Sequence, residues 1–413
     1  MKLKINLLPV ALALAGVFTV PSQAEVIKIA HIDPFTGPAA GINQSNANML
    51  AYVVDLVNRN GLAGPNNTFE VVAFDNKGSA QESLLQLKNA TDQGIRYVIQ
   101  GLSSAVGLAL IEGVGRYNER QPGKEIIYLN PTNTAPEMTN EKCSYWHFRF
   151  DSNQDMKITA LTNFMAKDKS LKKIYLINQN YAMGQQTSVA AKNDLKRLRP
   201  DIEIVGDDLH PMLAVKDFAP YVAKIKASGA DAVVTANWSA DLTLMVKAAK
   251  DASLKLPFYT VNAATTGIPT ALAAAGFDNV KLVTHWTPND DLKASKILVD
   301  PFKVKYNDDF TNLPWYTAVR MLSQAIKDAK SSDPLAVARA LENVRITSIN
   351  GELQMRKSDH QIQQPLIIAN WTKVNGKDVT YDLEKTGYGF KTVEKVEPYI
   401  SSLPTSCQMK RPG

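Results

Sequence analysis

The sequence predicts an α/β protein made of two Rossmann-like lobes, each built around a parallel central sheet. Two observations predict this fold class. Short runs of β-branched apolar residues alternate with segments of helical apolar spacing, and this alternation restarts near Lys173 after four repeats. The length of 413 residues is also what two domains require. Strand–helix alternation implies parallel sheets with right-handed crossovers.

The first 24 residues have the pattern of a secretory signal peptide. Lys2 and Lys4 precede an apolar stretch from Ile5 to Val20, and small residues occupy the positions before a cleavage site after Ala24. The stretch is short and contains Pro9, which argues against a retained membrane span. We therefore expect an exported, periplasmic protein.

The net charge indicates which partners to exclude, and the two cysteines indicate a possible disulfide. Cleavage removes two lysines, which lowers the net charge from +6 to +4. So small a charge argues against a nucleic-acid partner. The only cysteines are Cys143 and Cys407. An oxidising compartment favours a disulfide between them, and Cys407 lies in a polar tail with little else to hold it. Two unrelated buried thiols are the alternative.

The chain up to residue 149 reads as the main part of the first lobe. A helix with an apolar stripe from Met49 to Val57 follows the first strand, and another helix runs from Ser79 to Gln93. A third helix begins after Ser104, with Val106 on its apolar face. The four strands are expected at Val26–Asp33, Phe69–Asp75, Tyr97–Gln100 and Ile126–Leu129.

The second lobe repeats this arrangement. Its strands are expected at Lys173–Ile177, Ile202–Val205, Ala232–Thr235 and Pro257–Val261. A mostly helical region follows from Lys293 to Asn343, then two strands, Gly351–Met355 and Pro365–Trp371. We expect three crossover segments, at Phe148–Phe150, Thr284–Trp286 and Leu353–Asp359. They divide the chain into a first lobe (25–149 and about 286–353), a second lobe (150–285 and about 354–376) and an irregular tail packed on the surface (377–413).

Two polar turns at strand ends are candidates for a ligand site in the first lobe. Ser103 and Ser104 stand where a strand meets a helix, and the unpaired N–H groups and dipole of a helix N-terminus favour a carboxylate. Simple helix capping by either serine is the alternative. The turn after the next strand contains Thr132, Asn133 and Thr134. Open α/β sheets bind ligands beyond the carboxyl ends of their strands, so the two turns are expected to converge.

The second lobe offers strand-end candidates of its own. Tyr181, Trp238 and Asn262 each follow a predicted strand. Aromatic walls with a few polar groups are typical of small-molecule sites. Trp238 in the core and Tyr181 on the surface are the alternative placements.

No catalytic or metal motif stands out. Residues 101–105, Gly-Leu-Ser-Ser-Ala, nearly match the nucleophile elbow of serine hydrolases, but Ala105 replaces its second glycine. A hydrolase also needs a base histidine, and His147, His210, His285 and His360 lie in no suitable context. The histidines and cysteines lack metal-ligand spacing. We therefore expect binding without turnover, with no metal and no cofactor.

The chain resembles the leucine/isoleucine/valine-type substrate-binding proteins of ABC importers, the type I periplasmic binding proteins. The resemblance spans nearly the whole mature chain and rests on the order and spacing of several motifs. These are Thr36-Gly37-Pro38, the 101–104 turn, the stretch from Pro131 to Thr139, Tyr181-Ala182-Met183-Gly184, and the stretch from Leu254 to Phe258. It implies two lobes that close over the ligand, a membrane permease as partner, and a monomer.

The resemblance also implies site roles. The ligand carboxylate is held by Ser103 or Ser104 and by Thr134, with Thr132 and Asn133 supplying main-chain groups. Trp238 and Tyr181 then contact the ligand from the second lobe. A ligand-sensing subunit of a membrane receptor is an alternative function.

One position departs from the family pattern. Members that bind branched-chain amino acids usually have a carboxylate for the ligand ammonium where this chain has Asn262. A buried ammonium without a countercharge is costly. Asp33, Asp241 and Asp278 are candidate substitutes, although no sequence feature brings them to the cleft. The ligand is therefore expected to be a branched-chain amino acid or a related small carboxylate or amide, including one without an α-amino group.

Overall fold

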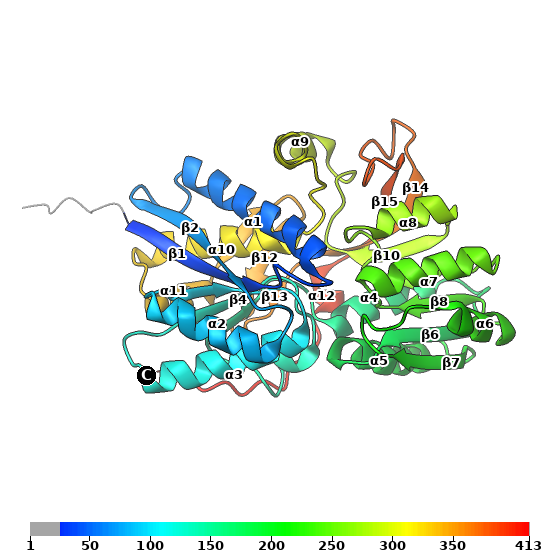
Figure 1. The fold of residues 1–413 in the computed structure, drawn as a ribbon, viewed down its shortest axis with the longest axis horizontal. Helices are drawn as coiled ribbons and strands as arrows, with labels where there is room; N and C mark the ends of the chain where they lie inside the picture. Colours follow the sequence, from blue (N-terminus) through cyan, green and yellow to red (C-terminus); the bar gives the residue numbers. More distant parts are fainter. Residues whose placement is uncertain (1–24, 413) are drawn as a thin grey trace, which may run out of the picture.

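The computed structural model describes residues 25–412, and it has two lobes side by side (Figure 1). The predicted signal peptide lies outside the described residues. Within residues 25–412, no helix is both long and apolar enough to cross a membrane. The fold class predicted from the alternation of strands and helices is confirmed by two parallel central sheets.

The sheet of the first lobe has five parallel strands in the order β2-β1-β3-β4-β5. The order reverses between β1 and β3, which is where open α/β sheets form ligand crevices. The strands are β1 (Glu25–Asp33), β2 (Asn67–Asp75), β3 (Tyr97–Ile99), β4 (Ile127–Asn130) and β5 (His147–Arg149).

Helices cover both faces of this sheet, because successive strand residues point to opposite sides. In β1, Ile27 and Ile29 pack with α1 and α10, whereas Ala30 and Ile32 pack with α2 and α3. Apolar residues on both faces explain why the inner strands β1, β3 and β4 read as continuous apolar runs. The helices are α1 (Ala40–Arg59), α2 (Ala80–Asp92), α3 (Ser104–Arg120), the 3-10 turn η1 (Pro136–Thr139), α9 (Leu292–Tyr306), α10 (Leu313–Ala329) and α11 (Pro334–Leu341).

The second sheet repeats the topology of the first and then extends it. Its parallel part has the order β7-β6-β8-β9-β10, the same permutation as in the first lobe, and β14 and β15 add antiparallel strands beyond β10. The strands are β6 (Lys173–Gln179), β7 (Glu203–His210), β8 (Ala232–Thr235), β9 (Phe258–Thr260), β10 (Val280–Thr284), β14 (Leu366–Lys373) and β15 (Tyr388–Val396).

Five helices flank the second sheet. In β6, Ile174 and Leu176 pack with α4 and α5, and Tyr175 and Ile177 pack with α6, α7 and α8. The helices are α4 (Gln154–Met165), α5 (Ala182–Leu198), α6 (Ala219–Ala227), α7 (Ser239–Asp251) and α8 (Ile268–Ala275), and a short α12 (Pro398–Ser401) follows β15.

The third crossover segment does not lie at Leu353–Asp359, where the sequence predicts it. The strands β11 (Arg345–Ser348), β12 (Gly351–Met355) and β13 (Ile362–Gln363) pair with one another in a small separate sheet. Leu353, Met355 and Ile362 join the core of the first lobe. The chain therefore enters the second sheet only at β14, and we propose lobe boundaries that follow this sheet membership.

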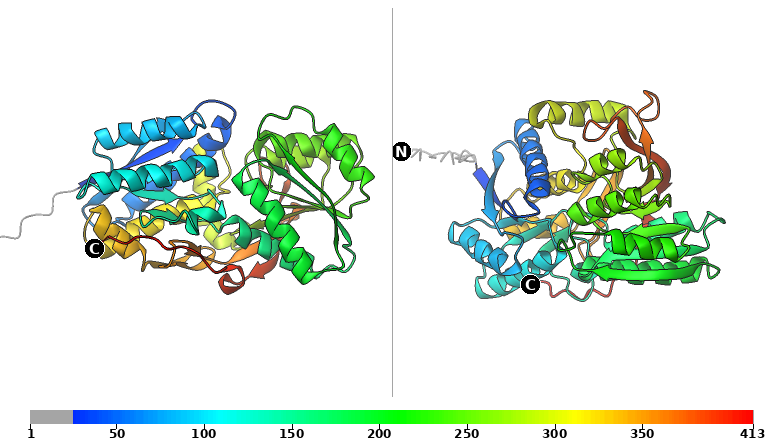
Figure 2. Two further views of the ribbon diagram at one scale, coloured as in Figure 1. Left: turned by 90° about the horizontal axis from the view of Figure 1, so that it is seen from below. Right: turned by 45° about the vertical axis from the view of Figure 1, so that its right-hand side comes forward.

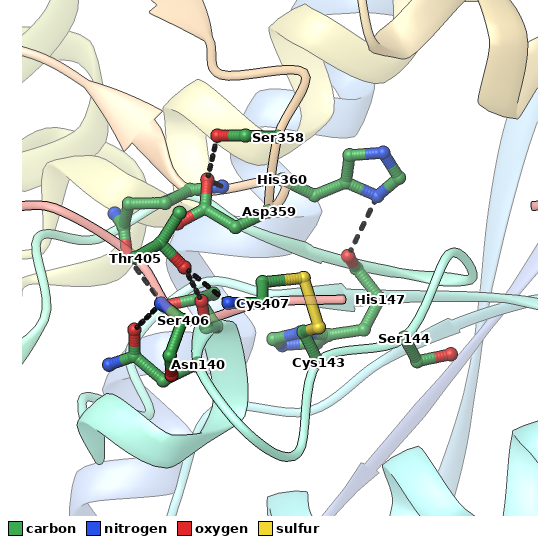
Figure 3. Close-up of a disulfide and its surroundings, with 12 residues drawn as sticks. Asn140, Cys143, Ser144, His147, Ser358, Asp359, His360, Thr405, Ser406 and Cys407 are labelled. Atoms are coloured by element: carbon green, nitrogen blue, oxygen red, sulfur yellow. Dashed lines mark hydrogen bonds between the residues drawn. A yellow bond between two sulfur atoms is a disulfide. The ribbon is translucent and has the colours of Figure 1, made fainter. Parts of the chain in front are cut away.

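The tail is also more ordered than expected. Residues 388–396 form β15, paired along its length with β14, rather than an irregular segment. Glu394 and Lys395 stand together between Val393 and Val396, so the segment lacks the period-2 alternation that predicts a strand. After α12 the chain returns to the first lobe, where it ends (Figure 2). The disulfide Cys143–Cys407 fixes it there (Figure 3), as expected from the oxidising compartment.

Candidate ligand-binding site

A cleft between the lobes lies at the carboxyl ends of both sheets. Residues from both lobes line it, so it depends on how the two lobes approach each other. All eight residues predicted from strand-end positions line this cleft: Ser103, Ser104, Thr132, Asn133, Thr134, Tyr181, Trp238 and Asn262. The two first-lobe turns thus lie together beyond the carboxyl ends of their strands, where open α/β sheets bind ligands.

The turn between β3 and α3 is held from behind by a buried carboxylate. Asp33, at the end of β1, accepts hydrogen bonds from the backbone N–H groups of Gly101 (2.9 Å) and Leu102 (3.0 Å). Gly101 has no room for a side chain, since a Cβ there would lie 2.7 Å from the Trp315 ring. Ser103 is the N-cap of α3, but its side chain makes no capping hydrogen bond and its φ is +75°. Such backbone strain in a non-glycine residue concentrates at functional sites.

The turn after β4 is tied both to the first turn and to the second lobe. The Ala135 N–H donates to Ser104 Oγ (3.3 Å), and Thr132 Oγ1 donates to the Gly101 carbonyl (2.7 Å). Thr134 Oγ1 donates to Oε1 of Gln154, the first residue of α4 (3.2 Å). The Asn133 Nδ2 group is used internally, because it donates to Gln100 Oε1 (2.7 Å), whereas Asn133 Oδ1 has no hydrogen-bond partner. These hydrogen bonds fix the position of the turn at the edge of the cleft.

The second-lobe wall consists of two aromatic residues and an amide. Trp238 Nε1 donates to the Tyr181 hydroxyl at 2.9 Å. Burial raises the pKa of that hydroxyl, so it is neutral at pH 7. The Trp238 side chain is 9% exposed, so it belongs to the core and to the cleft at once. Asn262 Nδ2 donates to the Ala236 carbonyl (2.8 Å), which fixes the amide against the end of β8.

Three ionisable residues in the cleft were missed by sequence reasoning. Lys157 Nζ lies 2.7 Å from Asp151 Oδ2, and His285 Nε2 lies 2.6 Å from Asp151 Oδ1. All three side chains are more than nine-tenths buried. Burial alone would raise the pKa of the Asp151 carboxyl, but the charges of Lys157 and His285 outweigh it and hold that pKa below its ordinary value.

The strand-end rule could have found two of these residues. Asp151 follows β5 and His285 follows β10 directly. Both segments were interpreted only as crossovers, because β5 has just three residues, two of them His147 and Arg149, and lacks an apolar run. Lys157 had no such signal, since it lies in the second turn of α4 on an otherwise apolar face.

None of the three carboxylates considered as substitutes lies in the cleft. Asp33 is bound beneath the β3–α3 turn, as described above. Asp241 accepts hydrogen bonds from Gln179 Nε2 (2.7 Å) and the Leu213 N–H (2.8 Å). Asp278 is exposed at the start of β10, at the opposite end of that strand from the cleft. Among the described residues that line the cleft, Asp151 is the single carboxylate.

The hydrolase pattern at residues 101–105 finds no base in the part of the chain that the structure describes. His285 reaches the same cleft, but its Nε2 faces Asp151, and no hydrogen bond joins a histidine to Ser103 or Ser104. Residues 25–412 also contain no cluster of three or more histidine, cysteine, aspartate or glutamate residues suited to a metal ion.

Comparison with known proteins shows the family of the chain. Residues 26–378 match the family described as "Periplasmic binding protein", and the chain belongs to that family. A curated relative, Leu/Ile/Val-binding protein homolog 4 of Brucella melitensis, is 33% identical over 98% of this chain and 97% of its own length. The family and function predicted from the sequence motifs are confirmed at this level.

Solved structures share the fold. The closed conformation of the leucine-, isoleucine-, valine-, threonine-, and alanine-binding protein from Brucella ovis has a TM-score of 0.83 and 29% identity, and covers 94% of this chain and 100% of that one. A solute-binding protein of an ABC transporter from R. palustris, in complex with benzoate, has a TM-score of 0.74 at 20% identity, covering 93% of this chain and 100% of that one. The second similarity shows the fold alone.

Proposed function

We propose that this protein is the periplasmic solute-binding component of an ABC importer. It binds a branched-chain amino acid, or a related small carboxylate or amide, between its two lobes and delivers it to an inner-membrane permease. The family supports this proposal, as do the relatives named for leucine, isoleucine and valine binding. The signal-peptide pattern of residues 1–24 supports export.

The observation that carries the proposal is the convergence of strand-end residues from both lobes on one cleft. In this account Ser103 or Ser104 and Thr134 hold the ligand carboxylate at the N-terminus of α3, where N–H donors and the helix dipole favour an anion. Thr132 and Asn133 shape the backbone of the second turn. Tyr181, Trp238 and Asn262 close on the ligand from the second lobe by a hinge movement.

A thermal-shift screen tests the proposal. The mature protein is unfolded and refolded to remove carried-over ligand, and it is then heated with leucine, isoleucine, valine, phenylalanine, small amides, short-chain acids and aromatic carboxylates. A ligand present at 100 times its dissociation constant stabilises the folded state by about 2.7 kcal/mol, which raises the melting temperature measurably. A shift with at least one compound is expected, and no shift with any member of the panel would contradict the proposal.

A further inference from the structure

At the carboxylate end of the cleft, backbone N–H groups are available as donors and the acceptors, among them the unpartnered Asn133 Oδ1, are neutral oxygens. The first N–H groups of α3 have no partner inside the helix. The carbonyls nearby already accept hydrogen bonds: Gly101 O from Thr132 Oγ1 (2.7 Å) and Thr134 O from the Gln154 N–H (2.8 Å). A carbonyl can accept a second hydrogen bond, but it brings no countercharge. This end therefore suits an anion better than an ammonium.

The one carboxylate in the described cleft lining is already neutralised. Lys157 Nζ donates to Asp151 Oδ2 at 2.7 Å, and His285 Nε2 lies 2.6 Å from Oδ1 without the geometry of a hydrogen bond. The fully buried guanidinium of Arg149 lies behind this cluster and adds to the favourable field on Asp151. Among the described residues that line the cleft, the charges of Asp151 and Lys157 thus balance each other. An entering ammonium would therefore meet a carboxylate whose charge Lys157 already balances, and it would bring a second cation next to Lys157.

The Asn262 amide on the second-lobe wall does not change this balance. Asn262 stands at the end of β9, and its Nδ2 is held by the Ala236 carbonyl. The Asn262 group left to accept a hydrogen bond from a ligand is a neutral amide oxygen. A buried ammonium that gains no countercharge loses its hydration without compensation.

We propose that the Asp151–Lys157–His285 cluster makes this cleft selective for small carboxylates that lack an α-ammonium group. The inference rests on the proposed function and specifies its ligand class. Lys157 is the specificity-determining residue, because its ammonium occupies the carboxylate that an amino-acid ligand would need.

Titration calorimetry with matched ligand pairs tests the inference on the refolded, ligand-free protein. The pairs are leucine with 4-methylpentanoate, valine with 3-methylbutanoate, and phenylalanine with 3-phenylpropanoate, which differ only in the α-ammonium. In at least one pair, the deaminated acid is expected to bind tenfold or more tightly than its amino acid. An amino acid that binds as tightly as its partner, or more tightly, overturns the inference and leaves the proposed function standing. Absence of binding by every compound in the wider panel contradicts the proposed function as well.

Two variants at the cluster sharpen the test. Lys157→Gln frees Asp151, so the affinity ratio should move at least tenfold toward the amino acid. Lys167→Gln is the matched control, because Lys167 is an exposed lysine paired with Glu394 outside the cleft, and it should leave the ratio unchanged.

Asp151→Asn keeps the test decisive if Lys157→Gln does not fold. It leaves Lys157 without its partner, so preference for the deaminated acid should rise further. Loss of a strong amino-acid affinity in Asp151→Asn would instead identify Asp151 as the ammonium partner and overturn the inference.

Discussion

Trp238 Nε1 donates a 2.9 Å hydrogen bond to the hydroxyl of Tyr181, and this bond joins the end of β8 to the start of α5. The two rings come from turns 57 residues apart in the sequence. Their contact sets the shape of the second-lobe wall, because the indole cannot rotate without leaving its N–H unpaired in a nearly buried position. Each of the two side chains therefore positions the other.

Tyr181→Phe removes the acceptor of this bond and keeps the ring. We expect ligand affinity to fall by about 1–3 kcal/mol, the range for a buried group left without its partner. A double-mutant cycle with Trp238→Phe, followed by calorimetry, measures the coupling. Additive losses in the cycle would mean that the two side chains act independently, contrary to this account.

Thr134→Ala removes a hydroxyl from the proposed carboxylate seat. Affinity should fall by about 1–3 kcal/mol, whereas Thr134→Ser keeps the hydroxyl and should bind nearly as the wild type does. Thr162→Ala is the control, because that threonine is buried in α4 and bonds to the Ile158 carbonyl outside the cleft. Unchanged calorimetric affinity in Thr134→Ala would remove this residue from the site.

Gly184 lies in the first turn of α5, where the helix backbone passes against the end of β6. A Cβ at this position would lie 1.9 Å from the Gln179 carbonyl oxygen. Gly184→Ala should therefore lower the free energy of unfolding by about 1–3 kcal/mol through overpacking. Gly115→Ala, within α3 and with open space around it, should raise it by about 0.5–1 kcal/mol. Urea denaturation compares the two, and equal effects would argue against the close approach at Gly184.

His147 makes the free energy of unfolding depend on pH. Burial lowers the pKa of this imidazole well below its ordinary value, and Arg149 lowers it further. Asn130 Nδ2 lies 3.1 Å from His147 Nε2, and Asn130 Oδ1 accepts from the Asn133 N–H, so the ring accepts at Nε2 and is neutral. The unfolded chain binds the proton that the folded protein refuses, so this contribution to stability is present above the ordinary pKa of about 6.5 and lost as pH falls below it.

One such group changes the free energy of unfolding by at most about 1.4 kcal/mol per pH unit. Urea denaturation of the wild type and of His147→Gln between pH 5 and 8 measures it. The variant should show a shallower decline toward low pH. Parallel stability curves for the two proteins would show that His147 does not contribute.

The disulfide Cys143–Cys407 fixes the C-terminal tail to the first lobe, together with hydrogen bonds from Thr405 Oγ1 to the Thr139 carbonyl (2.7 Å) and from the Ser406 N–H to Asn140 (Figure 3). The double variant Cys143→Ser, Cys407→Ser should lose about 2–4 kcal/mol of stability, because the unfolded chain gains freedom. Dithiothreitol should lower the melting temperature of the wild type to that of the variant. A wild type indifferent to reductant would contradict this role.

Sequence patterns predicted the parts of the fold that local physics determines. The strands β1, β3, β4, β6, β8 and β9 are largely buried on both faces, so they appear as apolar runs. Ser79 indicates the start of α2, where it is the N-cap. Strands β5 and β13 have three and two residues. They form because neighbouring strands are already in place, which no local pattern records.

The residues of the candidate site also fall into two groups, those that local sequence predicts and those that it does not. Ser103, Thr134, Tyr181 and Trp238 follow recognisable strands, so the rule for parallel sheets located them. The pairing of Asp151 with Lys157 and His285 depends on the packing of α4 against the end of β10, and on side-chain reach across it. Such a contact is a tertiary property, and residue spacing does not encode it.

A crystal structure of the protein with the tightest-binding compound of the panel tests the central claim most directly. The ligand should lie in the cleft between the lobes. Its carboxylate should accept hydrogen bonds of about 2.7–3.2 Å from the N-terminus of α3 and from Thr134, and its apolar part should lie against Trp238. A ligand bound outside this cleft, or one whose carboxylate points to the second lobe, would contradict it.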